Sequence, residues 1–393
     1  MSEWREVRLG DYIKTNIQSI GKNYPFEKIL YLDTGSITEN RIEKLQEFNL
    51  KRAPSRAKRL VCDDDIIYSL VRPNQLHYGF IKNPLENLVV STGFVVISCN
   101  KEAIQPKYLF YYLSSDTSTE YLHSIAEAST SAYLSLKPSD IEALDVEIPP
   151  LPEQKAIAEV LSSLDDKIDL LHRQNKTLEQ MAETLFRQWF VEEAGEDWEE
   201  GVLDDILTVK GGTTPSTKNA DFWGGDIHWT TPKDLSTNSP LFLMDTLRKI
   251  TKAGLEKISS GLLPKGTLLL SSRAPVGYLA FAEIPLAINQ GYIAIIDDKG
   301  FSSVFIYLWL KVNIDYVKSH ANGSTFQEIS KTTFKALKIA IPPKELRLMF
   351  DEIVNGNFKK IRTNSYQIRT LEKLRGTLLP KLMSGEVRIT SNG

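Results

Sequence analysis

The feature that most constrains this chain is a long internal repeat. The segment RQNKTLEQMAETL resembles YQIRTLEKLRGTL, so that Leu178 corresponds to Leu371, an offset of 371 − 178 = 193 residues. The same offset relates Ile148-Pro149-Pro150 to Ile341-Pro342-Pro343. Because self-similarity at a fixed offset indicates a duplicated structural unit, we expect two copies of one fold within the 393 residues.

A long amphipathic helix is predicted after each Ile-Pro-Pro, because proline is excluded from helix interiors but can open a helix. Apolar residues then recur in steps of four and three, with Asn357 and Asn364 as polar interruptions in the second copy. This spacing is typical of a coiled-coil seam. The predicted seams are Ile157, Leu161, Leu164, Ile168, Leu171, Leu178, Ala182, Leu185 and Trp189, and Phe350, Ile353, Ile361, Ile368, Leu371, Leu378 and Leu382.

Charge favours pairing of these two helices with each other, since acidic residues predominate in the first and basic residues in the second. Asparagine at a seam position costs stability but fixes register, which also favours a coiled coil. The alternative is that each amphipathic helix lies on its own domain. An antiparallel pair would hold the two flanking segments at opposite ends, a geometry suited to two separated targets.

The segment before each Ile-Pro-Pro mixes short β-rich runs with aromatic-rich helices at 108–114 and 305–311. We therefore predict a mixed α/β (α+β) fold with two globular domains, related by pseudo-two-fold symmetry and joined by two long helices that form an antiparallel coiled coil. The predicted parts are a first domain at 1–148, a central helix at 149–192, a second domain at 193–341 and a C-terminal helix at 342–393.

Composition excludes several classes of protein. Hydrophobic residues make up 42%, charged residues 25%, and the mean hydropathy is -0.22, all typical of globular chains. Two cysteines provide no disulfide framework and no CxxC metal site, which favours a reducing compartment. No apolar run of about 18 residues and no apolar leader are present. We expect a cytoplasmic protein without a membrane partner.

The net charge of -3 does not suggest nucleic-acid binding, but the charge is unevenly distributed. Residues 44–60 contain six basic side chains and only one acidic side chain, Glu47. Clustered Lys and Arg provide the electrostatic attraction to phosphates. The residues predicted to hold phosphates are Lys51, Arg52, Arg56, Lys58 and Arg59.

Polar side chains in the loops of both domains are candidates for base contacts, because Arg, Asn, Gln and Lys match base-pair edges in the major groove. The candidates are Arg72, Asn74, Gln75, His77 and Tyr78 in the first domain, and Trp229, Thr230, Lys233 and Gln290 in the second. Small hydroxyl residues after predicted helices, which can approach a phosphate closely, are Ser129, Thr130, Ser324 and Thr325. Each of these also fits an ordinary surface loop residue.

The order of several motifs resembles that of type I restriction-modification specificity subunits (HsdS). These motifs are KGGTTPS (210–216), WTTPKDL (229–235), RAPVG (273–277), NQG (289–291) and STFQ (324–327), followed by Ile-Pro-Pro and a long helix. The segment IPPLPEQKAIAEVLSSLDDKID is similar to the central conserved region of that family. The resemblance adds Lys210, Thr213, Thr214, Ser216 and Arg273 to the candidate DNA contacts.

What the resemblance implies is a subunit that binds double-stranded DNA with a bipartite, asymmetric target. Each target-recognition domain reads one half, and the helices dock two methyltransferase subunits, with restriction (translocase/nuclease) subunits joining through the complex. The first domain has NIQSIGKN (16–23) where the second has the GGTTPS loop. The two domains are therefore expected to read unrelated sequences.

Catalytic signatures are missing from the sequence. An adenine methyltransferase needs Asn or Asp before its Pro-Pro, where this chain has Ile148 and Ile341, and neither GxxxxGK[ST] nor HExxH occurs. A carboxylate-Lys nuclease in 147–155 is disfavoured, because Glu153 suits the positive end of a helix dipole. We expect no catalytic residue, metal or cofactor in this chain. The alternative function is a non-catalytic protein-interaction scaffold with duplicated binding domains.

Overall fold

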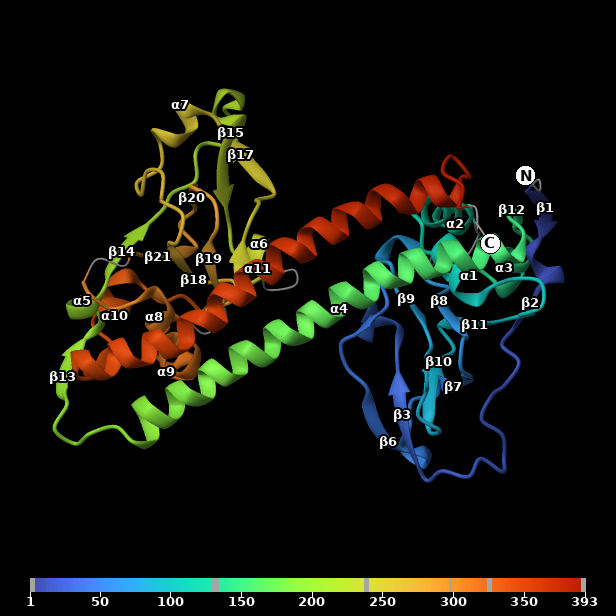
Figure 1. Ribbon diagram of the computed structural model, residues 1–393, viewed down its shortest axis with the longest axis horizontal. Coiled ribbons are helices and arrows are strands. Elements are labelled where there is room, and N and C mark those ends of the chain that lie inside the picture. The colour runs from blue at the N-terminus through green and yellow to red at the C-terminus, as the bar shows by residue number, and fades with distance from the viewer. Residues whose placement is uncertain (1–3, 129–133, 237–239, 297–298, 324–326, 390–393) are drawn as a thin grey trace. The chain divides into compact units, whose positions relative to one another are not determined.

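The computed structural model describes residues 4–128, 134–236, 240–296, 299–323 and 327–389. The chain forms two compact units (Figure 1). Unit 1 comprises Met1–Ile168 and Thr370–Gly393, and unit 2 comprises Asp169–Arg369. Helices α4 (Leu151–Arg187) and α11 (Lys344–Met383) each contribute one part to each unit. No described helix is long and apolar enough to cross a membrane.

The described residues of unit 1 form three main sheets, one further pair of two-residue strands, and helices α1 to α3. Its strands are β1 (Arg5–Arg8), β2 (Ile13–Thr15), β3 (Lys28–Leu32), β4 (Ile37–Thr38), β5 (Arg41–Ile42), β6 (Gln46–Asn49), β7 (Ala57–Leu60), β8 (Ile66–Ser69), β9 (Tyr78–Phe80), β10 (Leu88–Ser91), β11 (Phe94–Cys99) and β12 (Asp145–Ile148). Its helices are α1 (Pro106–Leu113), α2 (Asp116–Glu127) and α3 (Pro138–Glu142). The sheet orders are β1-β12, β2-β11-β8-β9 and β6-β3-β10-β7, with β4-β5 as a small extra pair.

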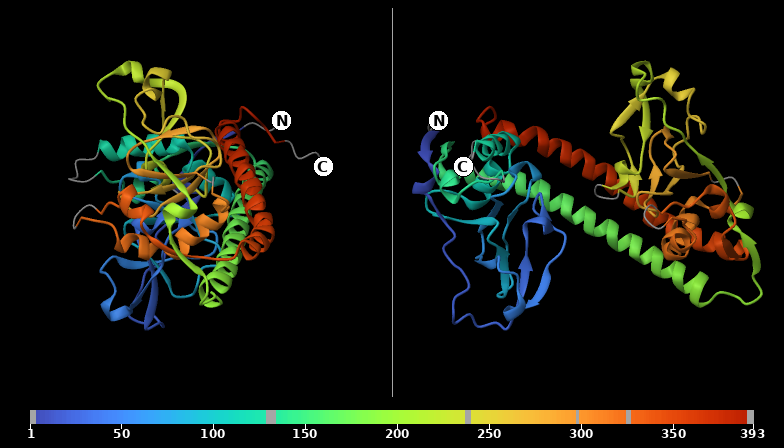
Figure 2. Two further views of the ribbon diagram at one scale, coloured as in Figure 1. Left: turned by 90° about the vertical axis from the view of Figure 1, so that its left-hand side faces the viewer. Right: turned by 180° about the vertical axis from the view of Figure 1, so that it is seen from behind.

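The chain passes from one large sheet of unit 1 to the other between β10 and β11. Gly93 lies at this crossing, where a Cβ would come within 2.9 Å of Thr34 Cγ2. The sheet that contains β11 packs against α1 to α3 and the start of α4, and this forms the main core of the unit. The sheet that contains β3 and β10 extends away from that core (Figure 2).

Unit 2 repeats this arrangement. Its strands are β13 (Glu199–Val202), β14 (Thr208–Gly211), β15 (Trp223–Thr230), β16 (Phe242–Leu243), β17 (Arg248–Ile250), β18 (Leu268–Ser271), β19 (Leu279–Ala282), β20 (Leu286–Ile288), β21 (Tyr292–Ile296) and β22 (Lys338–Ile341). Its helices are α5 (Leu203–Ile206), α6 (Lys233–Ser236), α7 (Lys252–Leu255), α8 (Ser303–Val312), α9 (Ile314–Ser319) and α10 (Lys331–Lys335). The sheet orders are β13-β22, β14-β21-β18-β19-β16 and β17-β15-β20.

Two parallel strand pairs fix the correspondence between the units. In unit 1, β10 pairs with β3 so that Leu88 lies opposite Leu30. In unit 2, β20 pairs with β15 so that Leu286 lies opposite His228. The predicted duplication and the aromatic helices, now α1 and α8, are therefore confirmed.

Helices α4 and α11 pair with each other in an antiparallel direction inside each unit, as predicted. In unit 2 the Asn357 side chain donates to Leu178 O at 3.3 Å, and Asn364 Nδ2 donates to Asn175 Oδ1 at 2.9 Å. In unit 1 Arg375 binds Asp165 at 3.0 Å. Asn364 is fully buried and Asn357 is half-buried, and their hydrogen bonds favour a single register of the two helices.

The predicted seam is wrong at one position of α11. Ile353 is 49% exposed, whereas Val354 is fully buried. The shift follows from Phe350, whose ring packs edge-on against Phe186 and Phe190. The next residue on the face of Phe350 lies four positions later, and this residue is Val354.

Among the described residues, the prediction that opposite charges join the two helices is confirmed in unit 1 but not in unit 2. In unit 1, Arg375 pairs with Asp165, and Arg388, just beyond α11, pairs with Glu153 of α4. Among the described residues of unit 2, the ion pairs of α11 go to the β-rich part of the unit instead. They join Arg362 to Glu283 and Arg369 to Asp245.

The corrected seam makes a testable prediction about stability. Phe350→Ala should lower the free energy of unfolding by roughly 3–5 kcal/mol, because it empties a fully buried aromatic site. Ile353→Ala, one turn away on the exposed side, should change it by no more than about 0.5 kcal/mol. Urea unfolding followed by far-UV circular dichroism measures both, and equal destabilisation by the two variants would contradict the assigned seam.

Candidate nucleic-acid interface

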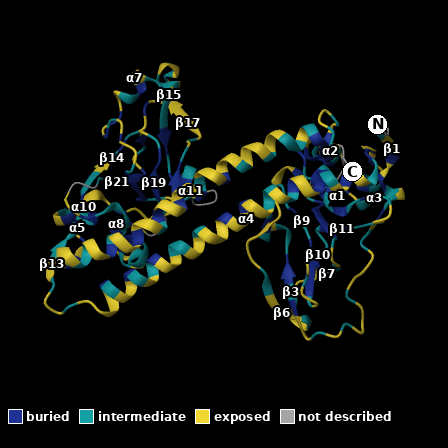
Figure 3. Ribbon diagram, in the orientation of Figure 1, coloured by how far each residue is buried: buried dark blue, intermediate teal, exposed yellow. Residues whose placement is uncertain are grey.

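The basic segment of unit 1 folds as a short 3-10 turn, Leu50–Arg52, followed by β7. Lys51, Arg52, Arg56 and Lys58 are exposed, and within the described residues none of them forms an ion pair with a carboxylate. Arg59 is half-buried, and burial lowers the pKa of its guanidinium. Four of the five predicted phosphate contacts are therefore exposed cations without a carboxylate partner among the described residues. Figure 3 shows exposed ribbon, in yellow, in the part of unit 1 that contains β6.

In the loop after β8 (residues 72–77), some candidate side chains are exposed and one is held by an internal hydrogen bond. Arg72, Asn74 and Gln75 are exposed around a 3-10 turn, Pro73–Gln75, that begins after Arg72 in a left-handed conformation (φ 49°). The His77 ring is held inside, with Nδ1 2.6 Å from Ile37 O. Only the first three side chains have their polar groups available to a ligand.

Tyr78 belongs to the core of unit 1. Its ring stacks on Tyr68 at a centroid distance of 5.9 Å and meets Phe110 edge-on. Burial raises the pKa of its hydroxyl well above the ordinary value. The expectation that Tyr78 contacts a base is therefore corrected, since an aromatic residue on a β-strand in this position is packed against α1.

The GGTTPS loop of unit 2 (residues 211–216) is held by hydrogen bonds to neighbouring segments. Thr213 Oγ1 donates to Lys257 O at 2.7 Å and accepts from Ser259 N at 3.1 Å. The exposed Thr214 hydroxyl donates to Gln290 Oε1 at 2.6 Å, which joins two candidates that are far apart in sequence. Lys210, Ser216 and Gln290 are also exposed.

Two tryptophans hold this loop in place. Trp229 Nε1 donates to Thr213 O at 3.3 Å, and Trp223 Nε1 donates to Ser216 O at 3.1 Å. Trp229 is 3% exposed and Thr230 is fully buried. The expectation that Trp229 and Thr230 reach base edges is therefore corrected, because their side chains support the loop from inside.

A surface cavity of about 320 Å³ lies beside this loop. Lys233, at the start of α6, and Arg273 both line it, so the fold brings together two further candidates. Arg273 is also 3.6 Å from the carboxylate of Glu328. The other lining residues are Thr231, Pro232, Ser236, Ala274, Asn289 and Gly291.

Four candidates, Ser129, Thr130, Ser324 and Thr325, lie outside the described residues. Over the residues that are described, no group of His, Cys, Asp and Glu has the arrangement of a metal site.

Sequence reasoning missed the exposed cations of unit 2 at Arg248, Lys252 and Lys257. They lie on β17 and near α7, in the part of unit 2 that corresponds to the basic segment of unit 1. Residues 248–257 contain four basic side chains and one acidic side chain, Glu256, so the local charge was a signal that could have found them. Aligning the two Gly-containing strand pairs around Gly93 and Gly291 would have indicated the correspondence.

Comparison with known proteins gives a consistent result. The family described as "Type I restriction modification DNA specificity domain" matches residues 1–180 and 195–346. The HindI specificity subunit of Haemophilus influenzae is 28% identical over 98% of this chain and 100% of its own length. The MjaIX specificity subunit of Methanocaldococcus jannaschii is 37% identical over 49% of this chain and 45% of its own.

A solved structure also resembles this fold. The type I restriction-modification S subunit from M. genitalium superposes with a TM-score of 0.57, covering 97% of this chain and 96% of that chain at 17% identity.

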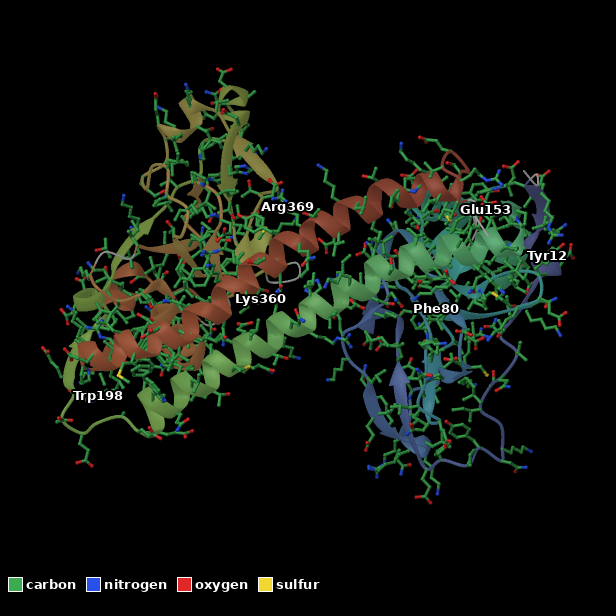
Figure 4. All side chains as sticks on the ribbon, viewed as in Figure 1. Tyr12, Phe80, Glu153, Trp198, Lys360 and Arg369 are labelled. Carbon is green, nitrogen blue, oxygen red and sulfur yellow. The ribbon has the colours of Figure 1, made fainter. Side chains whose placement is uncertain are left out.

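The indole hydrogen bond of Trp223 makes a second prediction. Trp223→Phe removes the donor to Ser216 O and should raise amide exchange in residues 213–216 roughly fivefold, since one such bond contributes about 1 kcal/mol. Trp198→Phe is the matched control, because the Trp198 indole N–H (labelled residue in Figure 4) has no hydrogen bond to any described residue. Hydrogen-exchange mass spectrometry measures both, and unchanged exchange in Trp223→Phe would contradict the anchoring role.

Proposed function

The chain belongs to the type I restriction modification DNA specificity family and is a non-catalytic DNA-recognition subunit, and from this premise we propose how its parts divide the work. Residues 1–148 and 193–341 are the two target-recognition domains, and each contacts one half of a bipartite, asymmetric sequence in double-stranded DNA. Residues 149–192 and 342–393 supply the helices that connect them. The observation that carries this proposal is the duplicated fold with exposed, unpaired cations at corresponding places.

Phosphate contacts are assigned to the basic segment of unit 1. The exposed Lys51, Arg52, Arg56 and Lys58 fit this role without rearrangement, and Arg59 joins them from a half-buried position. The proposed polar contacts also include Ser129, Thr130, Ser324 and Thr325. Phosphate contacts fix the position of a protein on DNA but carry little sequence information.

Base contacts are assigned to the side chains whose polar groups remain exposed. These are Arg72, Asn74 and Gln75 in the first domain, and Lys210, Thr214, Ser216, Lys233 and Gln290 in the second, where the half-exposed Arg273 joins them from the wall of the cavity. Thr213, His77, Tyr78, Trp229 and Thr230 act instead as positioning residues, because internal contacts occupy them.

Helices α4 and α11 are the proposed docking surfaces for two methyltransferase subunits. Apolar side chains that a monomer would otherwise bury are exposed on them, and exposed apolar groups of this size are typical of protein interfaces. They include Leu170, Met181, Leu348, Met349 and Ile353 in unit 2, and Val160 and Leu374 in unit 1. Restriction subunits would join through the assembled complex, in the cytoplasm, where two free cysteines are compatible with the reducing environment.

The protein-interaction scaffold is the weaker alternative. It explains the helix surfaces equally well but gives no role to the unpaired cations. Salt-independent partner binding without DNA affinity would support it.

The phosphate contacts make a third prediction. Replacing Lys51, Arg52 and Arg56 together by Ala should weaken binding to every duplex sequence and should reduce the slope of log K against log salt by about 0.9 for each lost contact. Fluorescence anisotropy of the chain in its methyltransferase complex, titrated with potassium chloride, measures the slope.

A charge-matched control is available in the same unit. Lys28, Lys82 and Lys101 are bound to carboxylates at 2.7, 3.1 and 2.6 Å, so their removal changes the net charge equally without removing a free cation. Their replacement by Ala should leave the slope nearly unchanged. An equal loss of slope in both triple variants would overturn the assigned contacts.

The separate cores of the two domains make a fourth prediction. Exchanging residues 1–148 for the corresponding segment of a relative should change one half of the methylated sequence and leave the other half unchanged, because each unit buries its own apolar residues. Exchange of 193–341 is the reciprocal control. Methylation-sensitive sequencing reads both halves, and alteration of both by either exchange would refute independent reading.

A further inference from the structure

Arg248 of β17 is an exposed cation that two indole rings hold in place. Its Cζ lies 3.5 Å from the centroid of the Trp223 ring and 5.5 Å from that of Trp229. The two rings meet edge to face at 5.0 Å. Because the same indoles hydrogen-bond Thr213 O and Ser216 O, the guanidinium is fixed beside the loop of candidate DNA contacts.

The donors of this guanidinium are unused. Within the described parts of the chain, Arg248 forms no ion pair and its side chain donates no hydrogen bond. By contrast, Arg362 and Arg369 of the same unit are bound to Glu283 and Asp245. Arg248 therefore combines a fixed position with five N–H groups that have no partner among the described residues.

This combination matches the recognition of guanine. The planar guanidinium donates two parallel hydrogen bonds to O6 and N7 at the major-groove edge of guanine, and stacking on an aromatic face restricts its orientation beforehand. A guanidinium can also bind a phosphate through two N–H groups, and the two kinds of contact differ in that only a base contact changes the sequence preference. We propose that Arg248 reads a guanine in the half-site of the second target-recognition domain, an inference that rests on the proposed function.

The corresponding position in unit 1 supports this assignment. Arg248 lies opposite Trp229 across β15 and β17, and Gln46 lies opposite Tyr31 across β3 and β6. The Gln46 amide donates to Asp33 Oδ2 at 3.0 Å. The two domains thus carry chemically different side chains at one place in a shared sheet, as expected where each domain reads its own bases.

The experiment uses the full chain assembled with its methyltransferase subunits and S-adenosylmethionine. A duplex library randomised in both half-sites is methylated, and sequencing of the modified molecules gives the preference at each base pair. Arg248→Ala and Arg248→Lys should both relax the preference for guanine at one base pair of one half-site by roughly 5- to 150-fold, the range for one bidentate contact. Lysine keeps the charge but lacks the two parallel donors.

Lys249→Ala is the matched control. Lys249 is also exposed on β17, but successive strand residues point to opposite faces, so its removal takes the same charge from the other side of the strand. The preference at every base pair should remain as in the unsubstituted chain. Retained recognition of the other half-site by all variants establishes that the assembly is intact.

Three results would overturn the inference. A uniform loss of methylation at all sequences would identify Arg248 as a phosphate contact, and unchanged preference at every base pair would remove it from recognition. If Lys249→Ala relaxed the preference at the same base pair, the effect would come from the positive charge of β17 and not from the guanidinium of Arg248. In each case the complex that contains the unsubstituted chain still methylates a bipartite sequence, whereas failure of that complex to do so would overturn the proposed function itself.

Discussion

Burial of the apolar faces of α4 and α11 is the interaction on which the structure of each unit depends. In unit 2, Phe350 of α11 and Phe186 of α4 enter the same aromatic cluster as Phe305 of α8. In unit 1 the start of α4 and the end of α11 close the core beneath α1 and the sheet containing β11. Because neither helix buries its apolar face alone, each domain and its helix segments form one hydrophobic core.

A buried carboxylate adds orientation to this apolar packing in unit 2. The side chain of Glu283 is fully buried and binds Lys265 at 2.9 Å, Arg362 at 2.8 Å and the Tyr366 hydroxyl at 2.9 Å. Two of these partners belong to α11, as does the nearby Arg369 labelled in Figure 4. Because the Glu283 carboxylate is buried, it needs these partners, and they fix where the sheet that contains β19 meets α11.

The two units share the same backbone support but carry different side chains for contact with DNA. The parallel strand pairs β3–β10 and β15–β20 have the same register in the two units, so they provide equivalent supports. The side chains on the neighbouring antiparallel strands differ, with Gln46 on β6 in one domain and Arg248 on β17 in the other. A duplicated fold can thereby contact two unrelated sequences, because base preference depends on a few side chains at the sheet edge and in its loops.

The sequence by itself determined the duplication, the two long helices, their pairing and the family, because these depend on patterns that repeat along the chain. Only the tertiary structure decided which candidates are accessible: Tyr78 and Trp229 are core residues, whereas Arg72 and Gln290 are exposed. It also separated Ile353 from Val354 and found Arg248 stacked on Trp223. The physical reason is that periodicity records which face of a helix or strand is apolar, whereas burial of a polar or aromatic side chain depends on contacts between residues distant in sequence.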